Sequence, residues 1–143
     1  MAVRRRTGLR MVDANANRAL EGILVCEEIV RFGLESPRMF RRLRTLRHAV
    51  GQAVRRLPVA PADLLRARHS RRDIGRRVFG SRASSLDGLL LMNFQRAKEA
   101  LRTLEECTRL LAPRQTAAFQ LLRFRTYEAE CDVLLLLAAL RDP

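Results

Sequence analysis

The residues best suited to chemistry in this chain occur in two similar segments. Residues 15–28 read NANRALEGILVCEE, and residues 93–106 read NFQRAKEALRTLEE, so the same Asn, Arg, Glu and Glu-Glu positions return at a constant offset. Arginine binds phosphate through two parallel hydrogen bonds, and carboxylates hold magnesium or accept protons. The repeated polar residues therefore predict either a phosphate-binding site or a buried network of ion pairs.

Helical spacing divides each segment into two stripes, because successive residues of an α-helix are about 100° apart. The apolar stripe comprises Ala16, Ala19, Ile23, Cys26 and Val30 in the first copy and Phe94, Ala97, Leu101 and Leu104 in the second. The polar stripe comprises Arg18, Glu21 and Glu28 in the first copy and Arg96, Glu99 and Glu106 in the second. If a two-fold axis relates the copies, both polar stripes are expected to converge on one pocket.

Two further features of the segments carry expectations. Gly22 and Ala100 are small, which predicts that a backbone or a ligand approaches there. Glu27 and Glu105 lie at the edge of the apolar stripe and need partners if they are buried.

Apolar residues recur at helical spacing in four stretches, and none alternates as a strand does. The sequence predicts an all-α fold: a four-helix bundle of two related helical hairpins, with internal duplication and pseudo-two-fold symmetry. We expect one domain over residues 1–143, with hairpins at about 13–57 and 84–141 and a functional or disordered loop at about 58–83.

The helix ends are also predicted. The first ten residues are expected to be a frayed arm, with Asp13 as N-cap and Gly33 ending the first helix. Ser36 and Ser85 are in position to cap the second and third helices. The repeat offset also carries Leu43, Leu46 and Arg47 onto Leu121, Phe124 and Arg125.

Charge and cysteine content bound the function classes. The formal net charge is +13, and all but one of the 28 basic residues are Arg, which reflects either anion recognition or a coding preference. Cys26, Cys107 and Cys131 are expected to be buried free thiols. The sequence has no secretory signal and no apolar run long enough to cross a bilayer, and we therefore expect a cytoplasmic protein.

Two histidines give no support for a hydrolytic triad, because no Ser or Cys motif accompanies them. His48 is expected to pack on the apolar side of the second helix. His69 opens the irregular loop and is the more available of the two.

A set of residues spread over nearly the whole chain carries a resemblance to a known family. The set comprises residues 13–15, 17–18, 21–22, 27–28, 31–32, 46–48, 68, 73–75, 93–106, 122–124 and 127. In these residues the chain resembles a small all-α family of hydroxymethylpyrimidine-phosphate kinases in thiamine biosynthesis, often fused to the N-terminus of thiamine-phosphate synthase.

The resemblance implies an ATP- and Mg-dependent kinase that converts hydroxymethylpyrimidine monophosphate to the diphosphate. The residues implied to bind substrate or phosphate are Asn15, Arg18, Arg47, Arg68, Asn93, Arg96 and Arg123. Glu21 and Glu99 are implied to be catalytic, together with Asp73, which would position or deprotonate an attacking hydroxyl. Glu28 and Glu106 are implied to bind the metal.

The chain departs from the family pattern at Leu24, His69 and Arg76, where we expect Arg, Asp and Thr. Losing the loop carboxylate removes a possible metal ligand, so an active kinase and a diverged or inactive member are both open.

The expected partners are the pyrimidine phosphate and ATP, and no membrane is expected. Thiamine-phosphate synthase and a second copy in a homodimer are left open as further partners. One alternative is a non-catalytic Arg-rich module that binds a nucleotide, nucleic acid or a protein. Few aromatic residues are available to stack on bases, which disfavours nucleic acid. A further alternative is a structural bundle without a ligand.

Overall fold

The structure, a computed structural model, describes residues 2–141, and none of these residues is in a β-strand. The predicted all-α class is confirmed. The helices are α1 (Ala2–Ile29), α2 (Pro37–Arg55), α3 (Pro61–Ala67), α4 (Leu86–Leu111) and α5 (Thr116–Arg141). A π-helical turn, Val30–Leu34, extends α1, and short 3-10 helices occupy Ser70–Arg72 and Pro113–Gln115.

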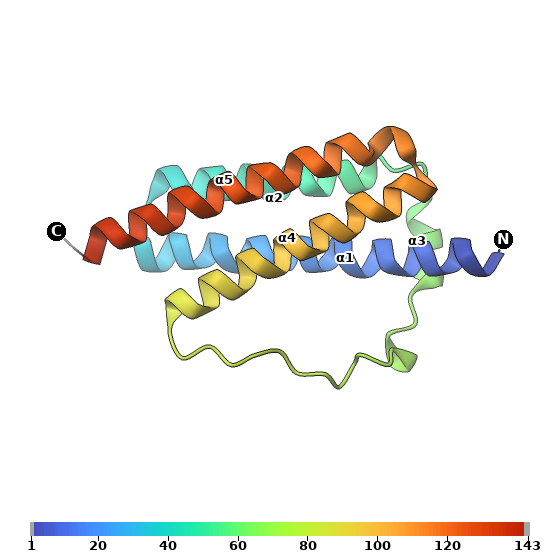
Figure 1. Cartoon of the computed structure of the whole chain (residues 1–143), viewed down its shortest axis with the longest axis horizontal. Coiled ribbons are helices and arrows are strands. Elements are labelled where there is room, and N and C mark those ends of the chain that lie inside the picture. Colours follow the sequence, from blue (N-terminus) through green and yellow to red (C-terminus); the bar gives the residue numbers. More distant parts are fainter. Residues whose placement is uncertain (1, 142–143) are drawn as a thin grey trace.

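The four long helices form a bundle (Figure 1). α1 runs antiparallel to both α2 and α4, and α5 runs antiparallel to α4. The segment between α3 and α4 passes along the side of α1 and α4 that faces away from α2 and α5 (Figure 1). The segment after α3 therefore lies beside α1, and its residues line a pocket together with α1.

The predicted helix starts at the two serines are confirmed. Ser36 Oγ accepts a hydrogen bond from Met39 N at 3.3 Å, and Ser85 Oγ accepts one from Gly88 N at 3.1 Å. Each bond satisfies a backbone donor that has no partner within its helix. The first helix ends at a different residue than expected: the left-handed position is Glu35 (φ 49°) and not Gly33.

The expected N-terminal arm is wrong, because α1 begins at Ala2 and Asp13 lies in its middle. Leu9 and Val12 are buried and continue the apolar stripe of the first repeat toward the N-terminus. The backbone at Gly8 lies close to the side chain of Leu111 at the end of α4. This packing stabilises a helix start in which many basic residues surround a narrow apolar face.

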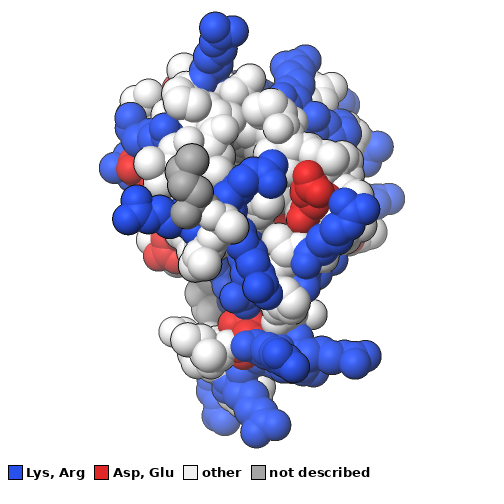
Figure 2. Space-filling model, turned by 90° about the vertical axis from the view of Figure 1, so that its right-hand side faces the viewer, with Lys and Arg blue, Asp and Glu red and all other residues white. Residues whose placement is uncertain are grey.

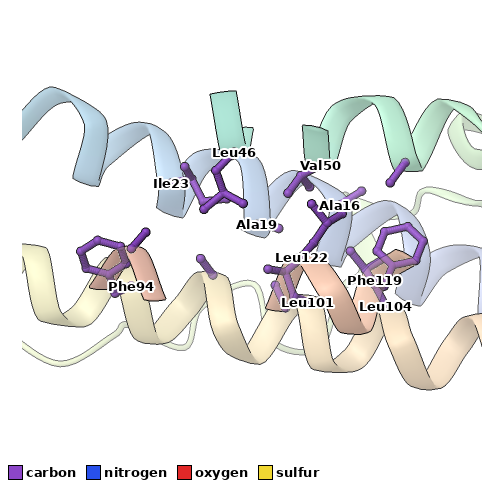
Figure 3. Close-up of a cluster of buried hydrophobic side chains, with 14 of the residues drawn as sticks. Ala16, Ala19, Ile23, Leu46, Val50, Phe94, Leu101, Leu104, Phe119 and Leu122 are labelled. Carbon is purple, nitrogen blue, oxygen red and sulfur yellow. The ribbon is translucent and has the colours of Figure 1, made fainter. Parts of the chain in front are cut away.

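The core is built from the apolar stripes of all four long helices (Figure 3). The side chains labelled there are Ala16, Ala19, Ile23, Leu46, Val50, Phe94, Leu101, Leu104, Phe119 and Leu122. All of these residues are buried, which confirms the apolar stripes predicted for both segments.

α1 and α4 approach each other closely at Gly22. A Cβ atom at this position would lie 2.9 Å from Asn93 O and 3.3 Å from Ala97 N. Ala19, Ala97 and Ala100 are also buried at the packed face. The small residues therefore serve the approach of a backbone, not of a ligand.

The two hairpins match in their buried positions, although not at the predicted offset in their second helices. Buried Leu43 and Leu46 of α2 correspond to buried Phe119 and Leu122 of α5, whereas Leu121 and Phe124 are exposed. The shift arises because the second connection is shorter: equivalent Glu–Arg pairs are 20 residues apart in the first hairpin and 18 in the second. The duplication itself stays a prediction.

Two burial predictions fail. Cys26 and Cys107 are buried free thiols, but Cys131 is exposed. His48 is exposed as well, because it lies on the outward face of α2 beside the buried Leu46 and Val50. No helix within residues 2–141 has the length and apolar character needed to cross a membrane.

Candidate functional site

A pocket of about 640 Å³ lies between α1 and the segment that follows α3. Its volume is in the range of small-molecule sites. It is lined by Thr7, Arg10, Met11, Asp13, Ala14, Asn15, Asn17, Arg18, Glu21, Arg68, His69, Ser70 and Asp73. We call it the α1 pocket.

A bidentate ion pair fixes one wall of the α1 pocket. Arg68 Nε and Nη2 donate to the two carboxylate oxygens of Asp13, both at 2.7 Å. This bond raises the pKa of the Arg68 guanidinium, since the neighbouring carboxylate favours the charged form. Arg68 thus ties the segment after α3 to the middle of α1. The same contact uses two donors of the Arg68 guanidinium, the group that the family resemblance assigned to phosphate.

Arg18 and Glu21 point to the α1 pocket from the exposed side of α1. Arg18 Nη1 donates a long hydrogen bond to Asn15 Oδ1 at 3.5 Å. Asn15 is buried and donates to Met11 O at 2.8 Å, which orients its side-chain oxygen. No ion pair involves Arg18 or Glu21 within residues 2–141. Arg18 is therefore a cation whose hydrogen-bonding capacity is available to an anion.

Asp73 lines the same pocket from the loop. Its Oδ1 accepts a hydrogen bond from Gly75 N at 2.8 Å and so closes a local turn. His69 contacts Arg6 of α1 through its ring Nε2. The structure thus brings together five of the predicted residues at the α1 pocket: Asn15, Arg18, Glu21, Arg68 and Asp73.

The second polar stripe lines a separate pocket of about 470 Å³, which we call the α4 pocket. Its residues are Ser81, Leu91, Met92, Gln95, Arg96, Lys98, Glu99 and Glu130. The expectation that both stripes converge on one pocket is wrong. α1 and α4 contact each other through Gly22 and Ala97, so their Arg and Glu side chains are turned to different flanks.

The α4 pocket resembles the α1 pocket in its repeat positions but carries more internal pairing. Glu99 accepts from Gln95 Nε2 at 2.9 Å, and Lys98 Nζ bonds Glu130 at 2.8 Å and lies 5.2 Å from the Tyr127 ring centroid. No ion pair of Arg96 occurs among residues 2–141. Its guanidinium lies beside the loop backbone at Gly80.

Other repeated residues form buried ion pairs instead of lining a pocket. Glu27 accepts from Arg47 at 2.6 and 3.2 Å, and Glu105 accepts from Arg123 at 2.8 and 3.4 Å. The two carboxylates are 2% and 1% exposed. These hydrogen bonds raise the pKa of both arginines. The expectation that Glu27 and Glu105 need partners when buried is confirmed. For these two glutamates, the buried network of ion pairs is the predicted alternative that the structure shows.

The remaining predicted residues lie away from both pockets. Asn93 is buried under α1 and donates to Leu89 O at 2.8 Å. Glu28 lies 3.9 Å from Arg31, and Glu106 lies 3.3 Å from Arg102 and 3.2 Å from Arg109. Residues 2–141 contain no group of three or more His, Cys, Asp or Glu that could hold a metal. Glu28 and Glu106 therefore do not fit a metal cage supplied by the protein.

Several lining residues of the α1 pocket were missed from sequence. Thr7 and Arg10 fell in the expected arm, and Asp13 was interpreted as a cap. A usable signal was present, because Leu9, Val12 and Ala16 continue one helical face and place Arg10 beside Asn17.

The surface of the molecule is strongly basic. Seen from the end of the bundle where α1 begins, Lys and Arg side chains cover much of the surface and few acidic groups show (Figure 2). With a formal net charge of +13, the molecule attracts phosphate-bearing compounds over a long range.

These features define the class: a helical-bundle domain with arginine-containing pockets on two flanks. The chain belongs to the ThiD2 family, whose model matches residues 10–132. It is similar to thiamine-phosphate synthases: 35% identical to the protein of Synechocystis sp., over 87% of this chain and 36% of that one. The protein of Rhodopirellula baltica is 33% identical over 94% of this chain and 36% of its own length.

The family is one of thiamine biosynthesis. The chain spans about a third of the length of the curated relatives it matches. No solved structure matches the chain.

Proposed function

We propose that the chain is a kinase that transfers the γ-phosphoryl group of Mg–ATP to hydroxymethylpyrimidine monophosphate and forms the diphosphate. The observation that carries the proposal is the α1 pocket of a chain in this family: Arg18 faces this cavity and has no carboxylate partner among residues 2–141. Magnesium is part of the nucleotide substrate in this proposal, since Glu28 and Glu106 do not form a cage.

The chemistry of this reaction gives Asp73 a different role from the one that the family resemblance implied. An oxygen of the substrate phosphate attacks the γ-phosphorus, the bond to the β-bridging oxygen breaks, and ADP leaves. A phosphate monoester is largely ionised near neutral pH, with a second pKa of about 6. No base is needed to prepare this nucleophile. Asp73 therefore shapes the loop through Gly75 and does not remove a proton.

Charge neutralisation and alignment are then the main contributions of the protein. Arg18 would hold the phosphate of the pyrimidine substrate, with Arg10 on the same wall of the α1 pocket. Glu21 would accept a hydrogen bond from the amino group of the pyrimidine ring. Asn15 would fix the position of Arg18, since the two already share a hydrogen bond.

The test is ATP-dependent formation of the diphosphate, followed by phosphorus NMR with Mg–ATP and the pyrimidine monophosphate. We expect Arg18→Ala to lower kcat/KM about 100-fold, because a charge-assisted contact to phosphate is lost. Asp73→Asn is expected to change it by less than about fivefold, because the amide oxygen can still accept from Gly75. Arg41→Ala on the exposed face of α2 is the matched control and should leave turnover unchanged.

Wild-type chain without turnover, and without a substrate-induced thermal shift, would contradict the kinase proposal. In that case the exposed arginines favour the alternative, a non-catalytic module that binds a nucleotide or a partner. Equal losses in Arg18→Ala and Arg96→Ala would show that both pockets contribute to one reaction.

A further inference from the structure

The outward face of α5 is apolar along most of its length. Positions 117, 121, 124, 128, 131, 135 and 138 alternate by four and three residues, which is the spacing of a coiled-coil seam. All seven side chains are exposed, and Leu121 and Leu135 are 62% and 63% exposed. The apolar members are Ala117, Leu121, Phe124, Cys131, Leu135 and Ala138.

The equivalent helix of the first hairpin provides an internal comparison. The buried pairs Leu43 with Phe119 and Leu46 with Leu122 set the register between α2 and α5. In that register the outward positions of α2 are all exposed and polar: Arg41, Thr45, His48, Gln52 and Arg55. The bundle fold therefore does not require an apolar stripe at these positions. Such a stripe on one surface indicates a contact with another molecule.

We propose that α5 packs against α5 of a second copy of this chain, in an antiparallel pair. An apolar stripe with heptad spacing packs best against another helix that carries the same kind of stripe. When a second copy of α5 is placed antiparallel, its stripe matches the first one. Pairing a with d positions sets Ala117 opposite the partner's Leu135 and Leu121 opposite the partner's Cys131. Small residues thus face large ones, and the two-fold axis makes each contact twice.

Charge supports a second copy as the occupant. The whole chain carries +13, so most of its surfaces repel another copy. α2 contains six arginines and no acidic residue. α5 is balanced, because its acidic residues Glu128, Glu130 and Asp132 match Arg123, Arg125 and Arg141. Of the α2 and α5 surfaces, α5 is the one that two copies can share without net repulsion.

The single charge in the stripe also has a partner in this arrangement. Glu128 would face the partner's Phe124 and lie beside the partner's Arg125. Within residues 2–141 neither Glu128 nor Arg125 takes part in an ion pair. The antiparallel pair provides each with one. A parallel pair would set two Glu128 carboxylates against each other, which disfavours that orientation.

The first test is the solution mass of the full chain by light scattering and sedimentation at several concentrations. We expect twice the 16.4 kDa of one chain. The double variant Leu121→Glu with Leu135→Glu should sediment as a monomer with unchanged helicity, because both side chains are exposed in one chain. Thr45→Glu with His48→Glu on α2 is the matched control and should stay dimeric.

The second test determines orientation. Leu121→Cys places a thiol opposite the partner's Cys131, so mild oxidation should link two chains covalently, whereas oxidised wild type should not be linked. A wild-type monomer at all concentrations would overturn the proposal, as would a dimer that survives the α5 double variant. Linkage of wild type through Cys131 would overturn the antiparallel arrangement. Association only with a thiamine-phosphate synthase would assign the stripe to a different occupant.

Discussion

Equivalent-looking arginines have two different roles in this molecule. Arg47 and Arg123 bond buried carboxylates, whereas Arg18 and Arg96 border pockets without an ion pair among residues 2–141. The difference follows from the helical position of the partner: Glu27 and Glu105 lie at the edge of the core, where desolvation demands a counter-charge. The repeated Arg and Glu residues therefore fall into two groups: some stabilise the fold as buried ion pairs, and others line the candidate pockets.

The buried carboxylates should be sensitive to neutralisation. Glu105→Gln leaves Arg123 without a counter-charge at the α4–α5 contact, and we expect the free energy of unfolding to fall by about 3 kcal/mol. Urea denaturation measures this loss. Glu106→Gln is the control: its carboxylate is 48% exposed, and a change below about 1 kcal/mol is expected. Equal effects of the two variants would refute the assignment.

The buried thiols predict a dependence of stability on alkaline pH. Burial raises the pKa of Cys26 and Cys107 above the ordinary value of 9.0, because desolvation disfavours the thiolate. Above about pH 9 the unfolded chain therefore releases protons that the folded chain keeps, and the free energy of unfolding falls as pH rises. Below that pH these thiols give no change.

Urea unfolding at pH 8 and pH 10 tests this dependence. The wild-type chain should lose more stability over the interval than Cys26→Ala does, whatever the absolute stability of the variant. A loss of the same size in both proteins would show that Cys26 is not responsible.

At the scale of elements, the approach of α1 to α4 is set by one glycine. Gly22→Ala should destabilise the chain by about 2 kcal/mol, because its Cβ would lie 2.9 Å from Asn93 O, which is backbone and cannot rotate away. Gly33→Ala meets nothing closer than 3.9 Å and serves as control. It should be neutral or stabilising by about 0.5 kcal/mol, because alanine lowers the entropy of the unfolded chain. Thermal and urea unfolding compare the two variants.

The loop after α3 depends on one anchor. Asp13→Asn removes the charge that Arg68 binds, so residues 68–85 should open more often and be cleaved by trypsin about tenfold faster. Asp63→Asn is the control and should leave the rate unchanged, because the Asp63 carboxylate accepts a hydrogen bond from the exposed Arg66 and does not hold the loop. An unchanged cleavage rate in Asp13→Asn would show that the anchor does not hold the loop.

The elements were largely predictable. Ser36, Ser85 and Pro113 mark helix ends through local chemistry, so they could be recognised without tertiary contacts. The N-terminal half of α1 was missed, because its many basic residues obscure the apolar face formed by Leu9, Val12 and Ala16. The exposure of His48 was missed because its neighbours are apolar while its own position points outward.

At the scale of the whole molecule, the positive charge predicts non-specific binding of nucleic acid, and its salt dependence distinguishes it from specific recognition. With +13 the chain should bind a labelled single-stranded oligonucleotide at 50 mM salt. Affinity should fall at least about tenfold at 200 mM salt, because released counterions drive such binding. Fluorescence anisotropy measures the change. Tight binding that persists at 200 mM would favour the nucleic-acid alternative over the kinase.

The sequence by itself determined the all-α class and the apolar stripes, since these depend on helical period and side-chain chemistry. It also named Arg18, the arginine that we propose to bind phosphate. Family membership follows from the same linear pattern. Only the tertiary structure decided which arginines pair with buried glutamates and which face a cavity. The helical period fixes the direction of a side chain around the axis of its helix, but it does not fix which residue of another element that side chain contacts. That neighbour is set by the contact at Gly22 and by the shorter second connection.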